Sequence, residues 1–152
     1  MPQGFFNYAI PTSATAGIPD LTPPGYGHDL SCTTDIDPMG IEVDGLTTLA
    51  QALFRRVITP RGTLLDDPNY GIDLTGYVND DLSPSDVARI GASVDAEFLK
   101  DERVLRSSTT ITLLGNGTVI TVASAVTPNS GATFQLVLSI TQVTAQILSV
   151  SQ

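Results

Sequence analysis

The stretch SPSDVARIGASVDAEFLKDERVLRSSTTITLLGNGTVITVASAV, residues 83–126, decides the fold because its apolar period changes from helical to alternating. Its first part predicts a helix that begins at Ser83, with Pro84 at the first helical position, and ends near Lys100. Asp86 stands where a capping box usually has glutamate. The side chains expected to form the buried stripe of this helix are Val87, Ile90, Val94 and Phe98.

The second part of the stretch predicts two strands joined by a tight turn. Ile111 and Leu113 alternate with threonines, and residues 118–126 are rich in β-branched side chains. Between them lies Gly115-Asn116-Gly117, whose residues tolerate the positive φ that a hairpin requires. A second turn is expected at residues 127–131.

One long final strand is expected after this turn. Its apolar side chains change parity at Thr141-Gln142, where we predict a bulge or bend that keeps one face apolar. The side chains on that face would be Phe134, Leu136, Leu138 and Ile140, then Val143, Ala145 and Ile147. The C-terminal part is therefore predicted as a three-stranded antiparallel meander.

A first helix is predicted upstream, in which Asp44 can serve as the N-cap and Pro60 ends the helix. Residues 59–82 form a long polar connection, and a connection of this length is usually functional or disordered. The apolar side chains that recur at helical spacing are Leu46, Leu49, Ala50, Leu53 and Val57.

The apolar side chains of the N-terminal residues follow neither the helical nor the alternating period. Residues 1–28 contain five prolines and four glycines, which predicts an extended arm. Short strands are expected within residues 29–36 and 41–44, with a turn between them. We therefore predict one α+β domain over residues 29–152, with two helices packed on a small antiparallel sheet.

The charge is distributed unevenly. The net charge is −9, yet residues 107–152 contain no charged side chain and residues 1–45 contain six acids with no Lys or Arg. A chain this acidic is repelled by phosphate groups, so we expect no nucleic-acid partner. No apolar run reaches the length of a membrane span, and no signal peptide is expected. Cys32 and His28 are the only residues of their types, so no metal or cofactor is expected.

Two motifs precede the second helix at a characteristic spacing. They are Thr59-Pro60-Arg61-Gly62, after a helix containing Leu49 to Arg56, and Pro68-Asn69-Tyr70-Gly71 running to Leu74. This pattern resembles the phage baseplate wedge and sheath-initiator family of contractile tails, historically labelled "gene-25-like lysozyme". The resemblance covers residues 29–126.

The resemblance implies a structural, non-enzymatic subunit of the virion tail baseplate, assembled in the host cytoplasm. It implies six copies per particle, contacts with wedge proteins and tail sheath protein, and the hub or tail tube as further candidates. The family's Glu-Pro-Arg signature corresponds here to Asp101-Glu102-Arg103, in which the proline is missing. Partner contact is therefore expected at Asp101, Glu102 and Arg103, and for Arg103 it is favoured over an internal salt bridge.

Arg61 has two interpretations, a partner contact or an internal salt bridge with Asp66 or Asp67, and the internal bridge is favoured. Gly62 and Gly71 are expected to serve the backbone through positive φ or close approach. Pro68 would help to form a turn that places Tyr70 in the core. Structural roles are thus expected for Pro60, Gly62, Pro68, Tyr70 and Gly71.

The uncharged final strand has two interpretations. Exposed strand edges are normally guarded by Lys, Pro or inward charges, and residues 132–150 contain none of these. The strand could lie inside its own sheet, or another chain could pair with it. The resemblance favours strand sharing with sheath protein. The partner-binding side chains would then be Phe134, Leu136, Leu138, Ile140, Val143 and Ile147.

The lysozyme label suggests an alternative, a peptidoglycan-degrading hydrolase. Such an enzyme needs two carboxylates across a cleft, one with a raised pKa. The glutamates are Glu42, Glu97 and Glu102, and Glu97 is expected on a solvated helix face. The chain has no Trp to form a carbohydrate platform. The residues show no acid–nucleophile pair, and no catalytic residue is expected.

Overall fold

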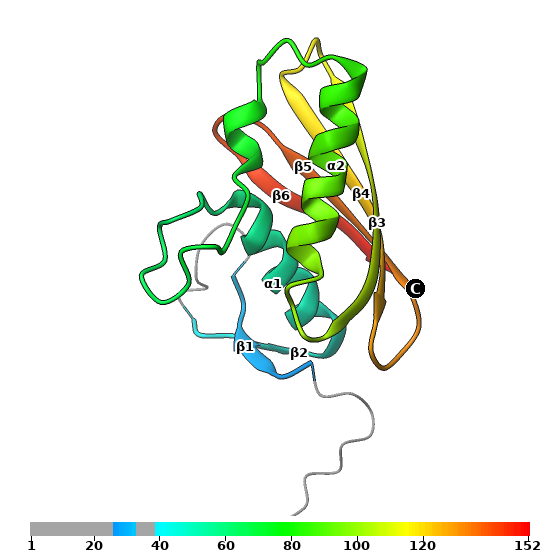
Figure 1. Cartoon of the computed structure of the whole chain (residues 1–152). Coiled ribbons are helices and arrows are strands. Elements are labelled where there is room, and N and C mark those ends of the chain that lie inside the picture. Colours follow the sequence, from blue (N-terminus) through cyan, green and yellow to red (C-terminus); the bar gives the residue numbers. More distant parts are fainter. Residues whose placement is uncertain (1–25, 33–38) are drawn as a thin grey trace, which may run out of the picture.

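The structure is a computed structural model that describes residues 26–32 and 39–152. In chain order the elements are β1 (His28–Leu30), β2 (Glu42–Asp44), α1 (Gly45–Ile58), the 3₁₀ helix η1 (Leu74–Tyr77), α2 (Pro84–Phe98), β3 (Val104–Leu114), β4 (Val119–Pro128), β5 (Phe134–Ile140) and β6 (Ala145–Ser151). Figure 1 shows α1 and α2 in front of the main sheet. The predicted α+β class is confirmed.

The main sheet is an antiparallel meander in the order β3-β4-β5-β6. It has four strands, so the prediction of three was wrong. The parity change is a chain reversal and not a bulge, because the N–H of Thr141 donates to the carbonyl of Thr144 at 2.7 Å and closes a turn. Val143 lies in this turn and is 92% exposed. A bulge does occur, but within β6, between the pairs Val137–Ser149 and Leu138–Ile147.

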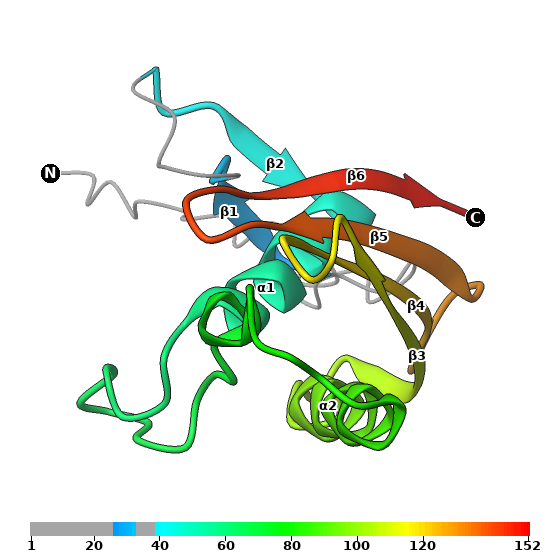
Figure 2. The same cartoon turned by 90° about the horizontal axis from the view of Figure 1, so that it is seen from above.

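The core lies on one face of this sheet. Side chains alternate along β4 and β5, so that every second one is buried against the helices. Leu49 and Leu53 of α1 and Val94 and Phe98 of α2 belong to the same cluster as Leu136 of β5, and all five are at most 1% exposed. Figure 2 shows the sheet curving around the two helices.

The helix ends follow the predicted signals. Ser83 and Asp86 form a complete capping box at the start of α2, as expected. Asp44 is the N-cap of α1, but its side chain makes no capping hydrogen bond. Helix α1 ends at Ile58, and Thr59 adopts the extended conformation that a following proline favours.

The connection after α1 is tied closely to that helix. Gly71 has φ of +91°, and a Cβ atom added there would lie 2.1 Å from the carbonyl oxygen of Thr59. Gly62 also has a positive φ, but an added Cβ there would meet nothing within 4 Å. The backbone roles predicted for both glycines are therefore confirmed, with close approach only at Gly71. Pro60 and Pro68 are exposed.

The start of the described chain is joined to the rest. Strand β1 pairs antiparallel with β2, which confirms two short strands in this region. Tyr26 donates its hydroxyl to the carbonyl of Ser130 at 2.8 Å, so this residue, assigned to the arm, packs on the body. The arm was predicted over residues 1–28, but His28 belongs to β1. Residues 1–25 of that arm and the strand and turn residues at 33–38 lie outside the described residues.

Candidate functional site

One edge of the main sheet is guarded by a helix. The carboxylate of Asp95, on α2, accepts hydrogen bonds from the backbone N–H of Thr109 on β3 at 3.2 Å and from the Thr109 hydroxyl at 2.6 Å. Gly91 lets α2 come close, since an added Cβ would lie 3.3 Å from the Thr109 carbonyl. A covering helix and an inward-pointing charge are two of the ways in which proteins protect strand edges.

No such guard covers the opposite edge, formed by β6, among the residues that the structure describes. Within residues 26–32 and 39–152, β6 is hydrogen-bonded to β5 and to no other strand. The bond between Thr141 and Thr144 closes the preceding turn, and narrow and wide pairs alternate from there along the ladder. Ala145 and Ile147 therefore direct their N–H and C=O groups away from β5. The strand carries no charge and no proline, so these groups form a template for another strand.

The strand predicted to bind a partner is not the one that is available. Phe134, Leu136, Leu138 and Ile140 are at most 1% exposed and lie on β5, between β4 and β6. Their assignment as partner-binding side chains was wrong, because the backbone of β5 is already paired on both sides. The predicted site is reduced to its last two members, Val143 in the turn and Ile147 on β6, which is half-buried.

A hollow lies beside the open edge. It has a volume of about 400 Å³ and is lined by Phe54 and Ile58 of α1 and by residues 143–145. Ala145, Ile147 and Val150 face the core from β6 but remain partly exposed. The apolar face of the sheet thus continues to the edge, where an added strand would cover it.

The bulge in β6 limits where a partner strand can pair. It places Leu148 out of register, and this side chain is 53% exposed. Bulges disturb strand edges locally, so the regular part available for pairing is Ala145–Ile147, before Leu148. The bulge therefore does not protect Ala145–Ile147 from pairing with another strand.

A second cluster surrounds a buried carboxylate. Glu97, on α2, is 1% exposed and is bound by Arg56 at 3.3 Å, Arg61 at 3.2 Å and Lys100 at 2.6 Å. The backbone N–H of Gly71 also donates to it at 2.9 Å. The expectation that Glu97 lies on a solvated face was wrong. Its burial could have been predicted from the sequence, because Glu97 lies seven residues after Ile90 and three after Val94, on the buried stripe of the helix.

This environment lowers the pKa of Glu97. Burial alone would raise it, but hydrogen bonds from Lys100 and the Gly71 N–H, with the charges of Lys100 and Arg56, outweigh burial and hold the pKa below its usual value. The carboxylate is thus kept ionised, and it ties the connection after α1 to both long helices.

The cations around Glu97 have further partners in that connection. Arg61 donates from Nε to the carbonyl of Gly71 at 3.0 Å, so the internal salt bridge favoured for Arg61 exists, but with Glu97 in place of Asp66 or Asp67. Arg56 lies over the ring of Tyr70, with its guanidinium carbon 4.5 Å from the ring centre. Tyr70 is half-buried under this contact and is not in the core cluster, contrary to its predicted place.

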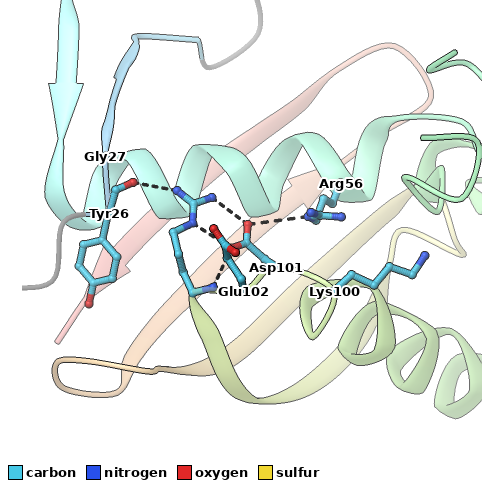
Figure 3. A pocket seen from close by; sticks show the side chains of 7 residues that line it. Tyr26, Gly27, Arg56, Lys100, Asp101 and Glu102 are labelled. Carbon is cyan, nitrogen blue, oxygen red and sulfur yellow. Dashed lines mark hydrogen bonds and ion pairs between the residues drawn. The ribbon is translucent and has the colours of Figure 1, made fainter. Parts of the chain in front are cut away.

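Asp101, Glu102 and Arg103 line a neighbouring hollow of about 500 Å³ (Figure 3). Arg103 donates to both carboxylate oxygens of Asp101 at 2.8 Å and to the carbonyl of Tyr26 at 2.8 Å. Asp101 is buried, and Glu102 is exposed. Burial raises the pKa of Asp101, but bonds from Arg103 and the charge of Arg56 outweigh it and lower that pKa.

These contacts give Arg103 an internal role that its sequence context did not indicate. Its guanidinium connects the start of β3 to Tyr26, just before β1. The side chain is 28% exposed, so one face still reaches the hollow, together with Lys100 and Arg56. Wedge contact at this site stays a prediction.

No described helix has the length and apolarity needed to cross a membrane. The described residues also contain no group of three or more His, Cys, Asp or Glu side chains that could hold a metal ion. Neither the comparison with models of protein families nor the search of curated proteins finds a match to this chain.

Proposed function

We propose that this chain is a structural subunit of a contractile phage tail baseplate, which joins the inner baseplate to the wedge and templates the first ring of sheath. The assignment to a contractile tail rests on the resemblance at residues 49–56, 59–62 and 67–74. The mechanism is supported chiefly by one observation, the contrast between the guarded β3 edge and the open, uncharged β6 edge. Six copies per particle and a location in the virion tail belong to the same proposal.

Strand sharing would take place along β6. A sheath strand lying beside Ala145–Ile147 would receive main-chain hydrogen bonds and extend the sheet by one strand. Its core-facing side chains would cover the hollow lined by Phe54 and Ile58. Backbone bonding supplies affinity that depends little on sequence, and the hollow supplies a preference for an apolar side chain at one position.

The wedge contact would use the hollow that Figure 3 shows. Arg56, Lys100 and Arg103 line it together with Asp101 and Glu102, and the fork of Arg103 is already paired with Asp101. A wedge segment that presents a carboxylate would therefore reach the ammonium of Lys100, whose side chain is 39% exposed. Glu102, in place of the family proline, lies exposed at the rim.

The peptidoglycan hydrolase is the less supported alternative. A glycosidase acid needs a raised pKa so that it holds a proton near neutral pH. Glu97, the buried glutamate, has its pKa lowered by the groups that bind it. Its carboxylate is also fully engaged with Arg56, Arg61, Lys100 and Gly71, so this residue is built for structure.

Particle assembly with a lysine substitution at either of two glutamines tests the proposed strand sharing. Gln146 is exposed on β6 and Gln135 is exposed on the central strand β5, so Gln146→Lys guards the open edge and Gln135→Lys is its matched control. We expect particles made with Gln146→Lys to carry baseplates and few sheaths, while Gln135→Lys gives normal tails. Normal sheaths with Gln146→Lys and also with Ala145→Pro, which removes an outward N–H, would contradict strand sharing.

A further inference from the structure

The open edge of β6 is complementary to itself. It reads Ala145-Gln146-Ile147-Leu148-Ser149-Val150-Ser151 and contains no charged side chain. An antiparallel neighbour for this strand can be the same strand of another molecule, because a twofold contact uses one patch on both partners. We infer that the free protein associates with a second copy of itself through antiparallel pairing of the two β6 edges, which joins two four-stranded sheets into one.

The charge distribution favours this contact over others between two copies. Each molecule carries a net charge of −9, so two copies repel one another over most approaches. All charged side chains lie within residues 1–106, whereas β6 lies in the uncharged region. Opposing side chains across a β6–β6 pair would therefore include no like charges, which destabilise strand pairs when they face each other directly.

The packing around the edge favours the same contact. A twofold axis that makes adjacent strands antiparallel stands perpendicular to the sheet, so the helices of both copies lie on the same side. Ala145 and Ile147, the core-facing side chains in the regular part of β6, are partly exposed in one copy and would lie beside Ile147 and Ala145 of the other. Covering them removes apolar surface from water. At the β3 edge, by contrast, Asp95 already binds the N–H of Thr109.

This association would mask the edge until another strand replaces it. A β6–β6 pair and a pair between β6 and a different chain use the same outward groups of Ala145 and Ile147, so the two exclude each other. The inference goes beyond the proposed function and does not depend on it, because it concerns the isolated chain and needs no sheath protein. A reversible pair also keeps an unguarded edge from open-ended aggregation.

The first experiment measures the molar mass of the purified full chain by sedimentation equilibrium over a range of concentrations. We expect a monomer–dimer equilibrium for the unmodified chain, at least a tenfold weaker dimer for Gln146→Lys, and an almost unchanged dimer for Gln135→Lys. Thermal unfolding of each variant checks that the fold is retained. A monomer at every concentration would overturn the inference, and so would equal weakening by both variants, which would indicate contact through the sheet face.

The second experiment locates the contact by disulfide cross-linking. In a Cys32→Ser background, single cysteines are placed at Gln146, Leu148 and Ser149 of β6, at Gln135 of β5 and at Ser108 of β3, all of which are exposed. We expect mild oxidation to link two copies fastest at the β6 position nearest the twofold axis. Fastest linking at Gln135 or Ser108 would overturn the inference. Because sheath assembly on baseplates is scored separately, loss of the dimer and loss of strand sharing are distinguishable.

Discussion

The carboxylate of Asp95 accepts the backbone N–H of Thr109 at 3.2 Å, so a side chain of α2 occupies a hydrogen-bonding group on the outer edge of β3. The same carboxylate also accepts the hydroxyl of Ser107 at 2.6 Å. The sheet thus has one edge that a helix closes and another, β6, that is paired on its inner side alone among the described strands. Among the described residues, the two edges of the main sheet therefore differ in how they are protected.

The buried carboxylate of Glu97 should contribute strongly to stability. We expect Glu97→Gln to lower the free energy of unfolding by about 1–3 kcal/mol, because three cations and the Gly71 N–H lose a charged acceptor while partly exposed Arg61 and Lys100 regain water. Urea unfolding measures the change. Glu102→Gln, at an exposed site, is the matched control and should leave stability nearly unchanged. Equal effects of the two substitutions would contradict the clamp role of Glu97.

Stability should fall on acidification. The pKa values of Glu97 and Asp101 lie below their ordinary values of 4.5 and 3.8 in the folded chain, so the folded state binds fewer protons than the unfolded state. Their contribution is therefore complete above about pH 5 and is lost as the pH falls through the folded pKa values. Urea midpoints measured between about pH 7 and pH 3 should show this loss, with a shallower slope for Glu97→Gln. The same slope in both proteins would show that Glu97 does not titrate as described.

Alanine substitutions at two glycines separate the cost of a positive φ from the cost of a clash between Cβ and a backbone carbonyl. Gly62 and Gly71 have φ of +87° and +91°, but only at Gly71 would a Cβ meet the carbonyl of Thr59. Gly62→Ala should therefore cost about 1 kcal/mol, the ordinary penalty for positive φ, and Gly71→Ala should cost clearly more. Chemical denaturation of both variants tests the difference. If Gly71→Ala were as stable as Gly62→Ala, the contact with Thr59 would not constrain the connection.

Arg103 allows internal and partner roles to be told apart. Arg103→Gln removes the paired bonds to Asp101, so the free energy of unfolding should fall by about 1–3 kcal/mol. Arg106→Gln, at an exposed arginine three residues on, is the control. We further expect Arg103→Gln particles to lose wedge joining. Normal wedge joining by a chain that is measurably destabilised would assign Arg103 to internal structure alone.

Features of the backbone that depend on a few neighbouring residues were predicted correctly from the sequence. The capping box at Ser83, the end of α1 before Pro60 and the positive φ of Gly71 each depend on a few neighbouring residues, and each was predicted. The turn between β5 and β6 was missed because it contains no glycine, proline or asparagine. It is closed by the backbone N–H of Thr141 together with the side chain of Thr141, whose hydroxyl accepts the N–H of Thr144 at 3.0 Å and donates to its carbonyl at 2.9 Å.

The candidate sites depended on contacts between distant residues, which the sequence does not show. Whether an uncharged strand lies inside a sheet or at its edge depends on the pairing of all the strands, so Phe134 was assigned to partner binding although it is buried on β5. The guard at Thr109 likewise requires α2 to lie beside β3. The burial of Glu97 could be predicted from its place on the buried stripe of α2. Its partners could not, because Arg56 comes from α1 and Arg61 from the connection after it.

The most direct test of the account is a cryo-electron-microscopy map of the intact particle from which this chain comes. The account predicts copies of the chain at the top of the baseplate, with a sheath strand hydrogen-bonded along Ala145–Ile147 of β6. It would be contradicted by a map in which the chain is absent from the particle, or in which the chain is present and the β6 edge is not paired with sheath.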